Sequence, residues 1–309
     1  MIGRSGIPSR RTSGKRFWGA VTALALAGSM LAGCAAILQK PDDLANGSCA
    51  DGGSSLEERL EIQVFVAASL ESVMQELAGR FLLEHPEIKI TFNADSSGKL
   101  LTQILEGYEC DIFFPAAQVQ MDRLEEAGLM EPGSRVDVVQ NQVAVVSYRG
   151  SKTEVTGLLD LWKAESIALA GGSVPVGRYA RQALRNLGIL AGDGDVADIS
   201  AKQVSESLGG VEISEQDNVS KTLASVVEAS CEVGIVYYSD TYGYKDKLDV
   251  LQVVEAGLTG EVSYPIAQVK NEEALDGQKE AAAEFISYLL SEEAKDIFQD
   301  YYFGTGNNN

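Results

Sequence analysis

The sequence contains one histidine, His85, among its 309 residues. Transition-metal sites are commonly built from several histidine and cysteine ligands, so a site based on a histidine cluster is excluded. A serine hydrolase needs a base beside its nucleophile, and His85 is the only imidazole that could serve. The G-x-S-x-G turn that carries the nucleophile of many hydrolases is also missing. These absences argue against most metal-dependent and serine-dependent enzymes, and we expect His85 to be a solvated helix end.

A nucleotide phosphate loop is missing as well. The stretch "NADSSGKLLTQI" comes nearest to one, but such a loop requires G-x-x-x-x-G-K followed by Ser or Thr. Here Asn93 replaces the first glycine and Leu100 follows the lysine. A dyad of Ser96 or Ser97 with Lys99 stays open as an enzyme alternative, beside the simpler interpretation that Lys99 is solvated.

Long apolar runs are scarce. The run from Phe17 to Ala32 has 16 residues, fewer than the roughly 20 that a membrane-spanning helix requires. Five basic residues precede it, which is typical of a secretory signal. The run ends in "LAGC", which resembles the lipobox of bacterial lipoproteins and would make Cys34 the lipidated first residue of the mature chain. We therefore expect residues 1–33 to be a lipoprotein signal peptide, with an ordinary signal peptide or a retained membrane anchor as the alternatives.

Basic residues are outnumbered, with 25 Lys and Arg against 45 Asp and Glu and a net charge of −20. Removal of residues 1–33 takes away five basic residues and no acidic one, which changes the net charge to −25. Such a chain repels a phosphate backbone, so nucleic-acid binding through its general field is excluded. Residues 34–60 are rich in Gly, Ser, Asp and Asn without a sustained period, which predicts a flexible tether.

Cysteines are few. With Cys34 assigned to lipidation, Cys49, Cys110 and Cys231 remain, and three cannot all pair within one chain. One disulfide is compatible with a compartment outside the cytoplasm. The spacing does not select a pair, and both Cys110 and Cys231 precede expected strands, where buried free thiols are common.

From Ile62 onward, short apolar runs alternate with segments of helical period. Strands are expected at "IQVFVAAS", "IKITF", "CDIFFPAA", "QVAVVSY", "SIALAGG", "GVEI", "EVGIVYYSD", "KLDVLQVV" and "VSYPIAQV". Alternation of this kind predicts an α/β fold with parallel sheets covered by helices. The roughly 250 residues after the tether exceed one average domain and allow two.

Serines follow two of these strands. Ser69 comes after "VFVAA", and Ser97 holds the corresponding place in the next β-α unit. Both should lie at the carboxyl edge of one sheet, where open α/β sheets bind ligands and where helix N-termini favour an anion. The alternative is that each serine merely caps its helix. Residues 171–180, "GGSVPVGRYA", make a similar strand-to-helix turn, and Tyr237 could give a phenolic hydroxyl to a ligand or be a core residue.

Six segments carry a resemblance to a known family: "VFVAASLESVMQELAGRF", "DSSGKLLTQI", "CDIFFPAA", "GGSVPVGRYARQAL", "GIVYYSD" and "SEEAKDIFQDYYF". From about Ile62 to Phe303 the chain resembles the molybdate-binding proteins (ModA type) of bacterial molybdate ABC transporters. The resemblance implies a two-lobed periplasmic-binding-protein-like fold of type II, each lobe a sheet flanked by helices, with the ligand in the cleft. It also implies a receptor, not an enzyme, that captures molybdate or tungstate and delivers it to a permease driven by an ATPase.

By motif, the resemblance carries five ligand-binding positions over to this chain. Ser69, Ser97 and Tyr237 would bind the oxyanion through their hydroxyls, and Ala116 and Val174 through their backbone amides. The metal would therefore be held only as molybdate or tungstate, by hydrogen-bond donors and without a cofactor. The alternatives are a receptor for another tetrahedral oxyanion such as sulfate or phosphate, and a hydrolase with Ser97 as its nucleophile.

Some features depart from the family pattern. Ala117 stands where the family often has an acidic residue, and Pro115 stiffens the loop beside the expected amide donor. The segment 191–210 looks longer than usual, and its stretch "AGDGDVAD" lacks the spacing of a calcium loop, which indicates a surface loop. We expect Arg178 to point to solvent, with a place at the mouth of the site as the alternative.

The resemblance also predicts where the chain divides. Lobe 1 would comprise residues 61–139 and 252–309, and lobe 2 residues 140–251, with crossovers near 137–142 and 248–255. Strands that leave one lobe and return make a hinge, and closure about it would bury the ligand. We expect a monomer outside the cytoplasm that is anchored to the cell membrane by its lipid, with the oxyanion, the permease and its ATPase as partners.

Overall fold

The computed structural model of this protein describes residues 60–306, which lie within one compact unit of the chain. The expected signal peptide, Cys34, Cys49 and nearly all of the expected tether lie outside the described residues. Leu60, the last residue assigned to the tether, is the first residue of a strand.

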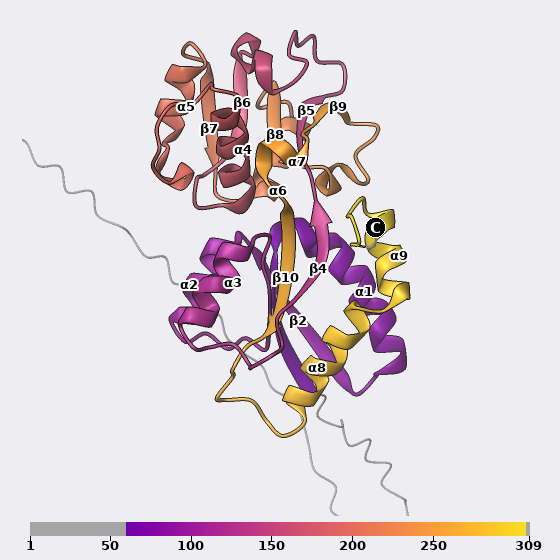
Figure 1. Cartoon of the computed structure of the whole chain (residues 1–309). Coiled ribbons are helices and arrows are strands. Elements are labelled where there is room, and N and C mark those ends of the chain that lie inside the picture. The colour runs from indigo at the N-terminus through magenta and orange to yellow at the C-terminus, as the bar shows by residue number, and fades with distance from the viewer. Residues whose placement is uncertain (1–59, 307–309) are drawn as a thin grey trace, which may run out of the picture. The chain divides into compact units, whose positions relative to one another are not determined.

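Two five-stranded sheets organise the described residues, and we call each sheet with its helices lobe 1 and lobe 2 (Figure 1). The lobe 1 sheet has the order β2-β1-β3-β10-β4, with β1 (Leu60–Ala67), β2 (Ile88–Asp95), β3 (Ile112–Phe114), β4 (Val136–Asn141) and β10 (Val262–Gln268). The lobe 2 sheet has the order β7-β6-β8-β5-β9, with β5 (Val143–Tyr148), β6 (Ser166–Ala170), β7 (Glu212–Gln216), β8 (Val233–Tyr237) and β9 (Leu248–Val253).

Helices cover both faces of the lobe 1 sheet, with α2 and α3 on one side and α1, α8 and α9 on the other (Figure 1). Their bounds are α1 (Glu71–Glu84), α2 (Ser97–Leu105), α3 (Gln118–Glu126), α8 (Gln278–Leu289) and α9 (Glu292–Asp300). Lobe 2 carries α4 (Pro175–Asn186), α5 (Ala201–Ser207) and α6 (Val219–Val227), and α7 (Ala256–Thr259) packs against α4 from the segment that leads back to lobe 1. Short 3-10 turns are η1 (Ala68–Leu70), η2 (Leu158–Lys163), η3 (Val196–Asp198) and η4 (Ser239–Thr241).

Apolar side chains at helical spacing explain this layering. In α2, for example, Leu100, Leu101 and Ile104 are buried, and they pack with Phe65 and Phe113 of the sheet. Because these positions recur on one side of the helix, the opposite side is left for polar residues. The two-lobed α/β fold that the sequence predicted is confirmed.

The sequence pattern predicted parallel sheets, and that prediction is wrong, because both sheets are mixed. Strands β1, β2 and β3 run parallel, and so do β6, β7 and β8, whereas β10 pairs antiparallel with β3 and β4, and β5 pairs antiparallel with β8 and β9. The reason is topological. Strand β4 leads the chain out of lobe 1 and β10 brings it back, so these two neighbours run in opposite directions, and β5 and β9 do the same in lobe 2.

The passages between the lobes are short. Gln142 alone separates β4 from β5, within the range predicted for the first crossover, although β4 itself was not foreseen as a strand. The second passage comprises residues 254–261 and includes α7. It lies later than predicted, because β9 pairs with β5 up to Val253, so residues 252 and 253 belong to the lobe 2 sheet.

Cys110 and Cys231 are both buried and free, so the disulfide that the sequence permitted between them is not formed. Burial raises the pKa of both thiols, which makes them unreactive core residues. Among residues 60–306, no helix combines the length and the apolar character needed to cross a membrane.

Candidate functional site

A small cavity lies between the two lobes. Its walls are formed by Ala67, Ala68, Ser69, Asp95, Ser96, Ser97 and Ala116 of lobe 1 and by Val174, Pro175, Val176, Val219 and Tyr237 of lobe 2. Most of these residues end a strand or begin the helix after it, because the carboxyl ends of parallel strands meet at one edge of a sheet. The structure therefore brings together all five positions carried over from the resemblance.

Ser97 is buried at the first position of α2, with 1% of its surface exposed. It does not cap the helix: Ser96 occupies the cap position, and no side chain makes a capping bond there. Instead, the Ser97 hydroxyl oxygen accepts a hydrogen bond of 3.0 Å from the backbone N–H of Ala116. A hydroxyl that accepts in this way keeps its own proton free to donate. In this structure the Ala116 amide is thus engaged with Ser97, and its role as a ligand donor stays a prediction.

Ser69 lies inside the turn η1 rather than at a cap, and η1 has no side-chain capping bond either. Its hydroxyl oxygen is 3.0 Å from the phenolic oxygen of Tyr264, which belongs to β10. The interpretation that both serines are only helix caps is therefore wrong. Elsewhere the chain does use side-chain caps, since Ser200, Asn218 and Ser291 each accept from a backbone N–H of the helix that follows.

Tyr237 is the last residue of β8, and 1% of its surface is exposed. Its hydroxyl has no hydrogen-bond partner among the described residues. Burial raises the pKa of this phenol well above its usual value, so the group stays protonated and able to donate. A buried polar group without a partner is costly, which points to a ligand that accepts from it.

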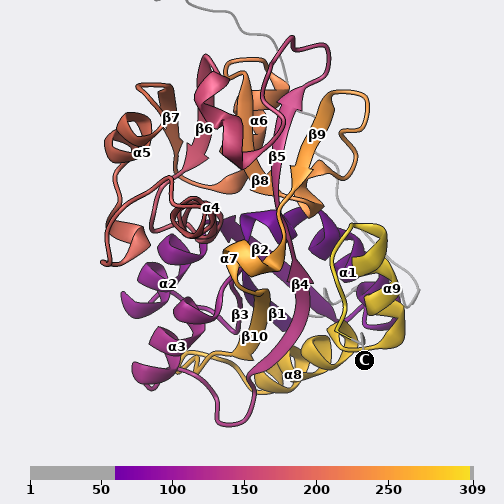
Figure 2. The same ribbon diagram turned by 45° about the horizontal axis from the view of Figure 1, so that its top comes forward.

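The first turn of α4 also faces the cavity. Figure 2 views α4 nearly end-on, between α2 of lobe 1 and the strands of lobe 2. The amide of Val174 donates 3.0 Å to the carbonyl of Gly171 in a turn, so its role as a ligand donor stays a prediction. By contrast, the amides of Val176 and Gly177 have no acceptor among the described residues. The free N–H groups at this helix start therefore lie two and three residues further along the chain than the sequence indicated.

Gly177 explains how α4 comes so close to the sheet. A Cβ atom at this position would lie 2.3 Å from the carbonyl oxygens of both Ala170 and Gly171. Only glycine therefore fits at this helix start, where the backbone rests on the end of β6.

Arg181, which the sequence pattern did not indicate, also stabilises the start of α4. Its guanidinium is fully buried and donates to the carbonyls of Ala170 (2.7 Å), Ile199 (2.7 Å) and Gly177 (3.0 Å). A fourth bond of 3.0 Å reaches the carboxylate of Glu215. The signal was present, because position 181 falls on the same helical face as Gly177, four residues earlier.

Arg178 does not enter the cavity and is not free in solvent. It pairs with Asp195 at 2.8 Å, and the Asp195 carboxylate also accepts from the backbone of Ala197. The surface loop around residue 195 is thus tied to α4, with η3 inside it.

Asp95, which the sequence pattern did not indicate, puts one carboxylate in the cavity wall. Its Oδ1 accepts from the Ser96 amide (2.7 Å) and from the side-chain amide of Asn218 in lobe 2 (2.9 Å). Lys99 Nζ lies 3.7 Å from this carboxylate and 3.8 Å from Asp217. Because Lys99 is paired with carboxylates and has no described bond to a serine, no contact supports the serine–lysine dyad.

A wider groove between the lobes adjoins the cavity at Ser96 and Val174. Its charged lining residues are Lys99, Arg123, Arg178, Asp195, Glu215 and Asp217. Three cations thus face three anions, so the approach to the cavity lacks the strong acidity of the chain as a whole.

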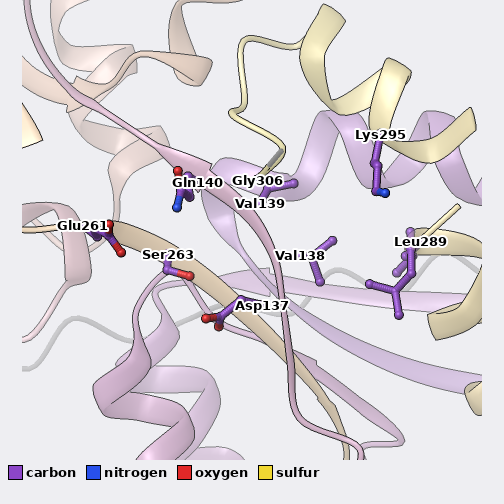
Figure 3. Close-up of a pocket in the computed structure, with 10 residues that line it drawn as sticks. Asp137, Val138, Val139, Gln140, Glu261, Ser263, Leu289, Lys295 and Gly306 are labelled. Atoms are coloured by element: carbon purple, nitrogen blue, oxygen red, sulfur yellow. The ribbon is translucent and has the colours of Figure 1, made fainter. Parts of the chain in front are cut away.

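A second hollow lies between β4, β10, α8 and α9, away from the five predicted positions (Figure 3). Figure 3 shows Asp137, Ser263, Gln140 and Glu261 on one side of β4, and Lys295 on the other. Two carboxylates and one lysine do not make a cradle for an anion. Within residues 60–306, no group of three or more His, Cys, Asp or Glu side chains could hold a metal ion.

Comparison with known proteins agrees with this architecture. A family model described as bacterial extracellular solute-binding protein matches residues 62–304. This chain belongs to that family. The solute-binding protein is 28% identical over 258 residues to YvgL of Bacillus subtilis, named as an ABC transporter substrate-binding lipoprotein, with 82% of this chain and 91% of the relative covered.

Two further comparisons bear on the ligand. The solute-binding protein is 30% identical over 269 residues to the molybdate-binding protein ModA of Escherichia coli, with 83% of this chain and 93% of the relative covered. Its fold is shared with the sulfate-binding protein SubI of Mycobacterium tuberculosis at a TM-score of 0.65 and 14% identity, covering 81% and 88% of the two chains. The sequence relationship thus includes a molybdate receptor, while the fold alone also accommodates a sulfate receptor.

Proposed function

We propose that this solute-binding protein captures molybdate or tungstate outside the cytoplasm and delivers it to an ABC permease and its ATPase. The observation that carries the proposal is the cavity between the lobes, where buried hydroxyls and unpaired amides converge. Ser69, Ser97 and Tyr237 supply the hydroxyls, and the first turn of α4 supplies amides without acceptors.

A cavity of this kind suits a fully deprotonated oxyanion. Molybdate and tungstate are dianions at neutral pH, so every oxygen accepts and none needs to donate. Fixed hydroxyl and amide dipoles stabilise such a charge without a paired lysine or arginine. The helix starts of α2 and α4 add a positive dipole end from each lobe.

The negative charge of Asp95 in the cavity wall does not oppose this function strongly. Its carboxylate is already bonded to the Ser96 amide and to Asn218, and Lys99 lies nearby. An anion that carries a proton, such as hydrogen phosphate, would need a free acceptor in the wall. Both hydrogen bonds to Asp95 go to Oδ1, so Oδ2 stays able to accept such a proton, and phosphate is therefore included in the ligand test.

We also propose that the protein acts as a monomer anchored to the cell membrane through a lipid on Cys34. The support is the sequence "LAGC" after an apolar run, and the relationship to a protein named as a lipoprotein. Replacement of Cys34 by serine should release the protein from the membrane into the medium. Unchanged retention of the Cys34→Ser protein would contradict the lipid anchor.

Isothermal titration calorimetry with molybdate, tungstate, sulfate and phosphate tests the ligand. We expect molybdate or tungstate to bind at least about tenfold tighter than sulfate, a difference of about 1.4 kcal/mol. Equal affinity for sulfate would favour the general oxyanion receptor instead.

A second measurement separates the receptor from the hydrolase alternative. Ser97→Ala removes a donor to a charged ligand and leaves the Ala116 amide without its acceptor, so affinity should fall about 10- to 150-fold. Thr102→Ala in the same helix is the matched control, because its hydroxyl bonds only to the carbonyl of Gly98. Hydrolytic activity that is lost in Ser97→Ala would support the enzyme alternative.

A further inference from the structure

We infer that Tyr264 and Asn141 are positioning residues, which orient the Ser69 hydroxyl so that its proton is available to the ligand. The inference rests on the proposed oxyanion function of the cavity. Neither residue lines the cavity, and both are buried, Tyr264 at 0% and Asn141 at 7% exposure.

The orientation of the Asn141 side chain is fixed by its neighbours. Its Oδ1 accepts from the backbone N–H of Gln142 (2.9 Å) and of Ser239 (3.4 Å), and a backbone N–H can only donate. Its Nδ2 therefore faces the other way and donates to Ser239 Oγ (2.8 Å) and to the phenolic oxygen of Tyr264 (3.1 Å). Both amide protons are used, so the group has no alternative orientation with equal bonding.

This orientation determines the direction of the next hydrogen bond. The phenolic oxygen of Tyr264 accepts from Asn141, and its own proton still needs an acceptor because the residue is fully buried. Ser69 Oγ, 3.0 Å away, is the acceptor that the described contacts offer. If Ser69 donated instead, the phenolic proton of Tyr264 would need the neighbouring Tyr237 hydroxyl as its acceptor, and that hydroxyl makes no hydrogen bond of acceptable geometry among the described residues. Tyr264 therefore donates to Ser69, and the Ser69 proton is left for the cavity.

The two serines of lobe 1 are thus prepared in the same way. Ser97 accepts from the Ala116 amide and Ser69 accepts from the Tyr264 phenol, so each hydroxyl has one lone pair occupied and its proton unused. Burial raises the pKa of Tyr264 well above its usual value, which keeps the phenol protonated at neutral pH.

The hydrogen bonds from Asn141 through Tyr264 to Ser69 also connect the cavity to the passage between the lobes. Asn141 is the last residue of β4, directly before the first passage, and Ser239 belongs to η4 in lobe 2. A change in the angle between the lobes would alter the contact between Asn141 and Ser239 as well as the cavity wall. We expect the Ser69 donor to be fully oriented only in the arrangement of the lobes seen here.

A double-mutant cycle of Ser69→Ala and Tyr264→Phe tests the inference in two independent ways. The first measures thermal stability without any anion. Ser69→Ala leaves the buried phenolic proton of Tyr264 without an acceptor, so adding Tyr264→Phe should restore at least part of the lost stability. A double variant that is no more stable than Ser69→Ala alone would overturn the hydrogen-bond direction, whether or not the protein binds an oxyanion.

The second arm measures molybdate affinity by calorimetry. Tyr264→Phe should weaken binding about 2- to 10-fold in the wild-type background and have no effect in Ser69→Ala. A purely structural role would give the same loss in both backgrounds, and that result would overturn the positioning role. Tyr301→Phe is the control, because it removes a phenol bonded to Glu76 (2.9 Å), which does not line the cavity.

Two further outcomes are decisive. If Tyr264→Phe fails to fold, Asn141→Ala removes the same constraint on the Tyr264 proton, and wild-type affinity in that variant would overturn the inference. If the wild-type protein binds none of the four oxyanions while the stability cycle shows coupling, the proposed function fails but the hydrogen-bond direction stands.

Discussion

Replacement of Tyr237 by phenylalanine should change stability and affinity in opposite directions. The phenolic hydroxyl is buried and has no partner among the described residues, while it lies in the wall of the cavity. Burying a polar group without a partner costs about 1–3 kcal/mol, and phenylalanine removes that cost. The free protein should therefore gain stability, by about 2–4 °C in Tm per kcal/mol for a domain of this size.

Anion binding should weaken in the same variant. A hydrogen bond to a charged group contributes about 1.5–3 kcal/mol, so Tyr237→Phe should lose about 10- to 150-fold in molybdate affinity. Differential scanning calorimetry of the free protein and titration calorimetry with molybdate give the two numbers on one sample.

Tyr288→Phe is the matched control for this experiment. The Tyr288 hydroxyl also lacks a partner, but it lies in α8, where the ring packs near Phe81 and Phe285. We expect a similar sign of the Tm change and no change in affinity. The reasoning is refuted if Tyr237→Phe binds molybdate like the wild type, or if it lowers the Tm of the free protein.

Three further expectations concern the surroundings of the cavity. Asn218→Ser keeps a capping residue for α6, but the serine side chain is too short to reach Asp95 across the cleft. Molybdate should therefore dissociate about 2- to 10-fold faster in stopped-flow measurements. An unchanged rate would mean that this bond does not hold the lobes closed. Burial raises the pKa of Asp240 from 3.8 to about 7, so the folded state retains a proton that the unfolded state releases, and stability should fall as pH rises through that window. Asp240→Asn should flatten this dependence in Tm measurements, and an unchanged slope would assign it to another group. Gly177→Ala should reduce molybdate affinity in calorimetry, because the new Cβ would meet two carbonyl oxygens at 2.3 Å. A Cβ at Gly79 in α1 would have nothing within 4 Å, so Gly79→Ala should leave affinity unchanged. Wild-type affinity in Gly177→Ala would show that the start of α4 tolerates the added Cβ.

Much of the β-α framework could be predicted from the sequence, because apolar runs and helical spacing are local. Strand β4 could not, since "VDVVQN" is short and its strand partners come from β10 and Gly304, far along the chain. The second passage was also placed too early for a similar reason. Nothing in "KLDVLQVV" itself says that β9 continues to Val253, because its partner β5 decides that.

The candidate site shows the same division between local and tertiary information. The positions of Ser69, Ser97 and Tyr237 at strand ends follow from the pattern of the chain. Their hydrogen-bond partners do not, since Ser97 and Ala116 are 19 residues apart and Ser69 and Tyr264 are 195 apart.

The sequence by itself therefore determined which side chains can donate at the edge of the sheets and that few of them carry a positive charge. Only the tertiary structure decided which donors are already occupied and which are free. The Val174 amide already donates to Gly171 in a turn, whereas the Tyr237 hydroxyl has no partner among the described residues. The physical reason is that whether a buried donor is free depends on which acceptors the fold brings within about 3 Å of it, and those acceptors come from distant parts of the chain.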